Sequence, residues 1–168
     1  GKSNVLSDGW KVEKIVKGLE LQGQRYTALF DTFTEEHGAH AFVVACDKYV
    51  SSDSGTGVVH QAPAYGEDDY RVCIENGIIE KGCKLPDPVD ANGCFTSEAP
   101  ESTVGVYIKD ADKLVIQLLK DKGLLLDSAK IVHSYPFCWR SKTPLIYRAV
   151  SSYFVRVEKI KSDLLKNN

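Results

Sequence analysis

The sequence predicts an α+β fold, in which a mixed and largely antiparallel β-sheet curls into a barrel with helices packed outside it. Segments rich in β-branched and aromatic residues outnumber the helical segments. They do not alternate with helices in the units of about 30 residues that build a parallel sheet. The chain of 168 residues, 43% hydrophobic and 26% charged, has the composition of an ordinary globular protein with one core.

The first third of the chain supplies the first expected strands. Residues 1–10 are polar and contain Gly and Ser, so we expect a loose segment there. Apolar and charged residues alternate over 11–20, and an internal glycine favours a strand or short β-pair over a helix. Residues 39–50 (AHAFVVACDKYV) and 57–63 (GVVHQAP) are bounded by turn residues and read as strands, the second ended by its proline.

A short helix is predicted over 68–75. Three consecutive acids, Glu67, Asp68 and Asp69, would lie in its first turn, where carboxylates stabilise the unpaired N–H groups. Asn76-Gly77 follows the last turn and can take the left-handed conformation that ends a helix. The turn-rich residues 85–95 come next, and their Asn92-Gly93 pair could close a hairpin.

The clearest helix is predicted within residues 109–123. Its apolar positions Ala111, Leu114, Val115 and Leu118 recur at helical spacing. Asp110 is expected to cap its first turn and Gly123 to stop it. Residues 130–139 and 144–158 are strand-like, and residues 159–168 are expected to form a short helical tail.

Bulk properties exclude several classes of protein. A net charge of −2 argues against strong nonspecific binding of nucleic acid, and no apolar run approaches the ~20 residues of a membrane span. The five cysteines are scattered without a CxxC pair, so they indicate neither a zinc ribbon nor a redox dithiol. Because the chain has no methionine, we expect it to be a piece of a longer protein.

Candidate functional residues gather in the stretch SGTGVVHQAPAYGEDDYRVC, which starts at residue 54. Either its acids only cap the helix, or His60 and Asp69 face a common ligand, since one acid would suffice as a cap. The GTG at 55–57 lacks the ending of a phosphate-binding loop and reads as a tight turn. In YPFCWRS, Tyr135 and Arg140 could flank an adenine, although burial in the sheet is the simpler interpretation.

The same stretch resembles the signature of the editing domain of isoleucyl-tRNA synthetases. VYIKDADKLVIQLLKDKG, HSYPFCWRSKTPLIYRA and YFVRVE match that family in the same order, in the form found in eukaryotic cytosolic enzymes. The HQAP sequence that contains His60 is the isoleucyl version, because related valyl enzymes usually carry lysine and leucyl enzymes methionine there. The resemblance runs from about Gly18 to the end and implies the barrel of the valyl, isoleucyl and leucyl editing domains.

The resemblance also implies a reaction and a site. The family hydrolyses Val-tRNA(Ile) by attack of water on the aminoacyl ester, in the cytoplasm. Asp69 would hold the ammonium group of the valine and His60 would line the side-chain pocket, as the two catalytic residues. Tyr135 would lie near the terminal adenosine, and Gly57 and Gln61 are also assigned to substrate binding.

Partners and domain limits follow from the same family. The expected partners are the valine-carrying acceptor end of tRNA(Ile) and the rest of the synthetase chain, with no membrane. Residues 1–17 would be a loose segment or the start of the domain, 18–150 the editing domain, and 151–168 a strand and helix returning toward the catalytic core. ATP and magnesium belong to that core, so no cofactor is expected for this domain.

Two departures from the family pattern limit these expectations. The threonine-rich TTTPWTLPSN segment that completes the family's pocket is absent, so we expect little or no hydrolysis by the chain alone. Some relatives have CWRC, which helps to bind zinc, whereas Ser141 stands in the second position here, so no metal is expected. A noncatalytic module that binds tRNA or protein is the alternative, and a free-standing trans-editing factor is disfavoured.

Overall fold

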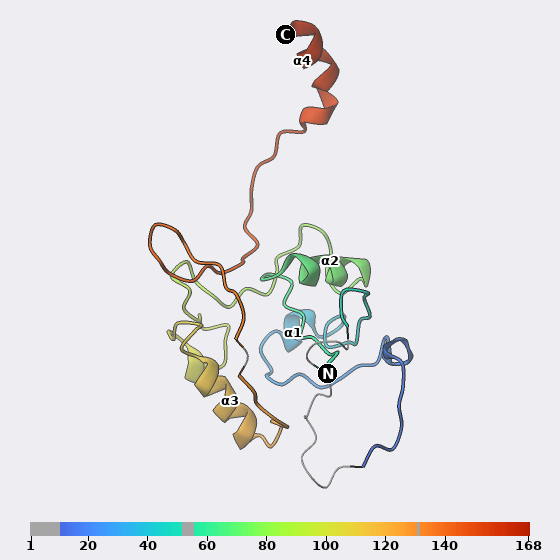
Figure 1. The fold of residues 1–168 in the computed structure, drawn as a ribbon, viewed down its shortest axis with the longest axis vertical. Coiled ribbons are helices and arrows are strands. Elements are labelled where there is room, and N and C mark those ends of the chain that lie inside the picture. The colour runs from blue at the N-terminus through green and yellow to red at the C-terminus, as the bar shows by residue number, and fades with distance from the viewer. Residues whose placement is uncertain (1–10, 52–55, 131) are drawn as a thin grey trace.

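The computed structural model describes residues 11–51, 56–130 and 132–168 (Figure 1). Most of this chain is turn and extended backbone, interrupted by seven short helical elements in the described residues. In chain order they are η1 (Gly18–Leu21), α1 (Thr34–His37), α2 (Glu67–Glu75), η2 (Glu101–Thr103), α3 (Asp112–Asp121), η3 (Val157–Lys159) and α4 (Lys161–Asn167).

The predicted α+β barrel is wrong. β-Pairing among the described residues is limited to four isolated antiparallel bridges, Arg25–Val43, Val89–Phe95, Cys94–Tyr107 and Phe137–Pro144. The segments predicted as strands are extended or turned, but they do not pair in ladders. A β-rich pattern shows that a segment can be extended, whereas a sheet also needs a second segment in register beside it. Prolines in three of these segments also remove N–H donors that a ladder would use.

The helix predictions are confirmed in position. Helix α2 begins one residue earlier than predicted, after the extended Gly66, and Gly77 beyond it has a φ of 66°. Helix α3 lies inside the predicted range, and Gly123 after it has a φ of 65°. Asp110 does not cap α3, however, because the capping position is held by Ala111 without a side-chain hydrogen bond. The predicted helical tail is α4.

Two predictions for the N-terminal part fare differently. Residues 11–20 form no β-pair, and their last three residues open η1 instead. The prediction of a loose segment at residues 1–10 lies outside the described residues.

The turn predicted at Asn92-Gly93 is confirmed, and it closes a minimal hairpin with the single β-bridge Val89–Phe95. The Gly93 amide donates to the Asp90 carbonyl at 3.1 Å, and the Asp90 amide donates to the Cys94 carbonyl at 2.9 Å. Gly93 is buried with a φ of 79°. A Cβ atom there would lie 2.9 Å from both Ile146 Cδ1 and Tyr107 Cε2, so the C-terminal segment passes directly over this turn.

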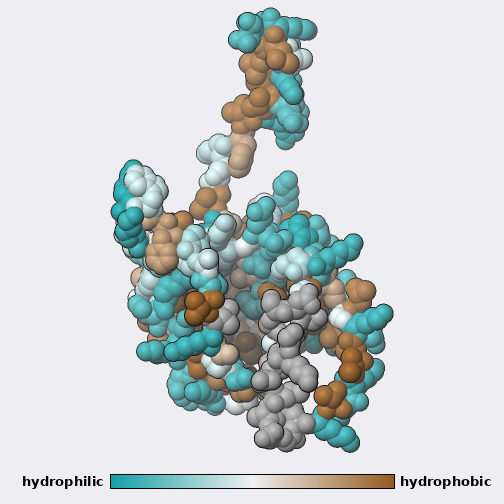
Figure 2. All heavy atoms as spheres, viewed as in Figure 1, coloured by the Kyte–Doolittle hydropathy of each residue, from teal (hydrophilic) through white to brown (hydrophobic). Residues whose placement is uncertain are grey.

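A small core lies between residues 64 and 111. All buried side chains of the described residues fall in this range: Ala64, Val72, Cys73, Ile79, Val89, Ala99, Thr103 and Ala111. Beyond residue 123 no described residue is buried. The chain leaves the core after residue 150 and carries α4 away from it, and Figure 2 shows hydrophobic side chains exposed along this extension.

Candidate functional site

The candidate site is the loop from His60 to Gly66 and the first turn of α2. Asp69, the third residue of α2, folds its carboxylate back over Gly66 at the helix start. A Cβ atom at position 66 would overlap Oδ2 of Asp69 and lie 2.8 Å from its Cγ. The absence of a side chain at Gly66 therefore gives the Asp69 carboxylate its place.

His60 and Asp69 interact electrostatically across this loop. The pKa of Asp69 is raised, chiefly because partial burial disfavours its charged form. A hydrogen bond with the backbone of Ala62 and the charge of His60 oppose that effect, and the neighbouring Asp68 adds to it. His60 is exposed in the loop, and Asp69 is half-buried nine residues later in the first turn of α2.

The neighbouring acid Asp68 has a different environment. Arg71 Nη2 donates to its Oδ1 at 3.0 Å, while Arg71 Nη1 donates to Asp47 Oδ2 at 2.9 Å and Glu75 Oε2 at 3.0 Å. Hydrogen bonds from Arg71 lower the pKa of Asp47 to about 2. Arg71 therefore offsets the repulsion within the acid cluster and ties α2 to the turn at Asp47.

A hollow of about 330 Å³ lies just before this loop in the chain. Its lining residues are Tyr49, Val50, Ser51, Thr56, Gly57, Val58 and Val59. Gly57, predicted to bind substrate, has a φ of 76° in the wall of this hollow.

Gln61, which is also predicted to bind substrate, donates from Nε2 to Tyr49 Oη at 2.5 Å. Its Oε1 is buried, has no hydrogen-bond partner among the described residues and could accept a donor from a ligand.

Tyr135 is not brought to the other predicted residues. Its hydroxyl donates to the Leu145 carbonyl at 2.7 Å and accepts from Lys109 Nζ at 2.8 Å. No interaction in the described part of the chain joins it to His60 or Asp69. The two regions approach through the backbone, because the Ala149 amide donates to the Ala64 carbonyl at 2.7 Å.

Sequence reasoning missed the residues that hold the loop in place. Asp87 accepts from the Tyr65 hydroxyl at 2.5 Å on one oxygen, and from Nε and Nη2 of Arg148 at 2.9 and 2.7 Å on the other. Burial and the hydrogen bond to Asp87 raise the pKa of Tyr65. Burial also favours a higher pKa for Asp87, but its hydrogen bonds with Arg148 and Tyr65 lower that pKa overall. Asp87 lies between two prolines, which indicates a restricted backbone there. No local sequence pattern, however, predicts that its partner is Arg148, 61 residues away.

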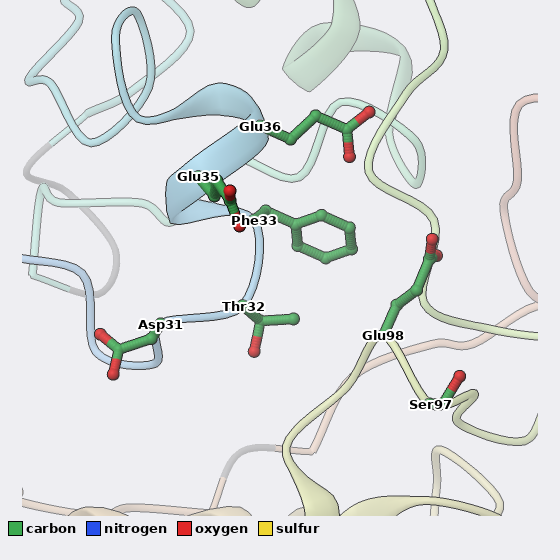
Figure 3. Close-up of a pocket in the computed structure, with 7 residues that line it drawn as sticks. All are labelled: Asp31, Thr32, Phe33, Glu35, Glu36, Ser97 and Glu98. Carbon is green, nitrogen blue, oxygen red and sulfur yellow. The ribbon is translucent and has the colours of Figure 1, made fainter.

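A second hollow, of about 310 Å³, is acidic (Figure 3). It is lined by Asp31, Thr32, Phe33, Glu35, Glu36, Ser97 and Glu98. Lys84 Nζ donates to Glu98 Oε1 at 3.3 Å. Among the described residues, no group of three or more His, Cys, Asp or Glu side chains is arranged to hold a metal ion.

Comparisons with known proteins identify the chain's relatives. No family model matches it. It is 52% identical over 167 residues to the cytoplasmic isoleucine–tRNA ligase of Arabidopsis thaliana, and 54% identical over 151 residues to that of Mus musculus. The isoleucine–tRNA ligase of the bacterium Bdellovibrio bacteriovorus is 49% identical over 158 residues, so the resemblance is not confined to eukaryotes. These matches cover 99%, 90% and 94% of the chain.

The relatives place the chain among the aminoacyl-tRNA synthetases, the ligases that supply charged tRNA for protein biosynthesis. Within that class, the chain belongs to the isoleucine–tRNA ligase family and corresponds to one segment of those enzymes. It spans only 14%, 12% and 14% of the three relatives' lengths. The plant and mouse enzymes are named as cytoplasmic, in agreement with the expected location. Separately, no helix among the described residues is long and apolar enough to cross a membrane.

Proposed function

We propose that this segment is the editing domain of a cytoplasmic isoleucine–tRNA ligase and hydrolyses Val-tRNA(Ile). The observation that carries the proposal is the environment of Asp69. Its carboxylate is half-buried, is turned toward the His60 loop, and forms no ion pair with Lys or Arg in the described residues. A partly desolvated carboxylate without a cation is suited to bind the ammonium group of an esterified amino acid.

The ammonium group would also correct the electrostatics of the site. Burial now raises the pKa of Asp69, which means that its charged form lacks stabilisation. A bound ammonium would supply the missing positive charge and lower that pKa. The carboxylate would then fix the orientation of the ester, which is worth more than a strong base for a bond that is already labile.

The amino acid side chain would lie near His60, which follows the lining residues Val58 and Val59 of the 330 Å³ hollow in the chain. Binding alone discriminates poorly between valine and isoleucine, the standard example of this problem, because one methylene is worth only ~1–3 kcal/mol. A pocket that fits valine rejects isoleucine by overpacking, which costs a further ~1–3 kcal/mol. We infer that the segment excludes the correct product by size.

The proposed reaction balances with water alone. The water oxygen bonds to the ester carbonyl carbon, the bond from that carbon to the ribose oxygen breaks, and the ribose oxygen takes a proton. The products are free valine and tRNA(Ile). The groups proposed to bind and orient the ester are Asp69, His60, Gly57, Gln61 and Tyr135, and the proposal includes no cofactor. The limits 18–150 for the domain, with flanking segments 1–17 and 151–168, stay a prediction.

The test compares two neighbouring acids in the full-length ligase that carries this segment. Asp69→Ala is expected to slow hydrolysis of Val-tRNA(Ile) at least tenfold, while charging with isoleucine is unchanged. Asp68→Ala is the matched control, because Asp68 faces Arg71 instead of the loop. Equal hydrolysis by the Asp69→Ala variant and the unaltered enzyme would exclude the proposed role.

A further inference from the structure

The side chain of Gln61 is hydrogen-bonded at only one end. Its carboxamide has an NH2 group that donates hydrogen bonds and an oxygen that accepts them. Nε2 donates to the Tyr49 hydroxyl at 2.5 Å. Oε1, by contrast, is buried and has no hydrogen-bond partner in the described part of the chain. Because a buried acceptor without a donor lowers stability, a ligand that brings a donor to Oε1 would relieve that cost.

Tyr49 is held in place by a chain of hydrogen bonds that begins in α2. Arg71, in α2, donates from Nη1 to Asp47 Oδ2 at 2.9 Å and from Nη2 to Asp47 Oδ1 at 3.2 Å. Asp47 Oδ1 accepts in turn from the Tyr49 amide at 3.0 Å. The backbone at Tyr49 is therefore tied to the helix that carries Asp69.

Tyr49 contributes to two features of the candidate site. Its ring is 40% exposed and lies in the wall of the 330 Å³ hollow. Its hydroxyl contacts Gln61, which precedes Ala62, the residue whose backbone forms a hydrogen bond with the Asp69 carboxylate. Tyr49 therefore joins the wall of the hollow to the loop of the site.

A structural role alone does not explain the arrangement of Gln61. A glutamine that only stabilises a fold is expected to form hydrogen bonds at both ends, or to leave its free end to water. Gln61 does neither within the described residues, because its nitrogen is anchored while its free oxygen is shielded from solvent. An anchored acceptor can bind a donor of a ligand with little loss of conformational freedom.

We propose that Tyr49 is a positioning residue, whose hydroxyl holds the Gln61 carboxamide so that Oε1 accepts a hydrogen bond from the aminoacyl ester. This inference rests on the proposed hydrolysis of Val-tRNA(Ile), in which Gln61 is one of the groups that orient the ester. The valine side chain has no N–H or O–H group. The donor is therefore the ammonium group of the ester or the free hydroxyl of the terminal ribose. Tyr49 acts through Gln61, because an ester held by a fixed acceptor reacts faster than one held by a mobile acceptor.

The experiment measures single-turnover hydrolysis of Val-tRNA(Ile) by the full-length ligase that carries this segment. Tyr49→Phe keeps the ring in the wall of the hollow but removes the hydroxyl, and it is expected to slow hydrolysis about fivefold. Gln61→Ala removes the acceptor itself and is expected to slow hydrolysis about tenfold. Tyr26→Phe, which removes the hydroxyl of another exposed tyrosine, is the control and should leave the rate unchanged. Charging with isoleucine should be the same in every variant.

The double variant tests whether Tyr49 acts through Gln61. Tyr49→Phe combined with Gln61→Ala is expected to be no slower than Gln61→Ala alone, since the hydroxyl then has no carboxamide to hold. A tyrosine that only stabilised the fold would cause the same loss in both backgrounds. Unchanged hydrolysis by Tyr49→Phe, or additive losses in the double variant, would overturn the proposal.

A second substrate identifies the donor. Val-tRNA(Ile) whose terminal ribose lacks the free hydroxyl keeps the ammonium group of the ester. A loss by Gln61→Ala that persists with this substrate assigns the ammonium group to Oε1, and a loss that disappears assigns the hydroxyl. Slow hydrolysis by Asp69→Ala together with unchanged hydrolysis by Tyr49→Phe would exclude the role of Tyr49 alone. Unchanged hydrolysis by Asp69→Ala would instead exclude the role proposed for Asp69, so the two failures are distinct.

Discussion

Residues 64–111 and residues 124–168 form a natural comparison, because both contain apolar patterns but only the first buries them. The first region includes every buried side chain of the described residues, down to 1% exposure at Thr103 and Ala111. In the second, Val132 and Tyr153 are fully exposed and Val155 is 78% exposed. The spacing of apolar residues therefore predicts which side of a segment can pack against another segment. Whether those residues are buried depends on whether such a segment lies beside them.

The largest contrast is expected from a charge placed in each region. Val72→Asp puts an unpaired carboxylate into the core and should cost more than about 3 kcal/mol of the free energy of unfolding. Val155→Asp places the same group in solvent and should change it by less than about 0.5 kcal/mol. Urea unfolding of both variants measures the contrast, and equal losses would mean that the core does not lie where the structure has it.

A smaller effect is expected where the two regions are joined. Asp87→Ala leaves Tyr65 and Arg148 without their shared acceptor, and the loss should be about 1–2 kcal/mol because the ion pair is partly solvated. Hydrogen exchange should accelerate at the Ala149 amide, which bonds to Ala64. Lys84→Ala, which removes an exposed pair with Glu98, is the control and should cost less than about 0.5 kcal/mol. Unchanged exchange at Ala149 would argue against this junction.

The pH dependence of stability separates two acids near α2. The pKa of Asp47 is lowered from 3.8 to about 2, so its contribution is present above pH 4 and is lost as the pH falls toward 2. The pKa of Asp69 is raised, so its charged form weakens the fold above that pKa. Asp47→Asn should therefore lower the Tm at pH 7, and Asp69→Asn should raise it. Both differences should shrink in acid, and shifts of the same sign would contradict the assignments.

The smallest effect on stability is expected at Gly66. Gly66→Ala should cost about 0.5–1 kcal/mol of the free energy of unfolding, because glycine is preferred to alanine at the capping position before a helix. Its new Cβ must displace the Asp69 carboxylate, so hydrolysis of Val-tRNA(Ile) by the full-length ligase should fall several-fold. Gly18→Ala, where the Cβ meets open space and φ is not positive, tests glycine loss alone. Full hydrolysis by Gly66→Ala would show that the exact place of the carboxylate is unimportant.

What the sequence could predict was local. The acids in the first turn of α2 and the glycines after α2 and α3 act within one helical turn, and these helices are where they were expected. The same reason allowed a prediction that His60 and Asp69 lie near each other, because only nine positions along the chain separate them. Their roles, and that of Tyr135, rest on the family resemblance and on the experiments above.

What the sequence could not predict depends on distant partners. Tyr49 meets Gln61, and Asp87 meets Arg148, through contacts that no short pattern encodes. The barrel prediction was wrong for the same reason: residues 130–139 and 144–158 have strand composition, but among their described residues only Phe137 and Pro144 form a bridge. Exposure of Trp139 likewise could not be read from an apolar, aromatic motif whose ordinary place is a core.

The separation of charge along the chain has a consequence for diffusion. Residues 128–157 carry a formal +5 and the remaining residues −7, so the molecule has an electric dipole although its net charge is small. An approaching polyanion would feel a torque that turns it toward the positive segment before any atom touches. Encounters would then be faster at low ionic strength and slow as added ions shorten the reach of the field.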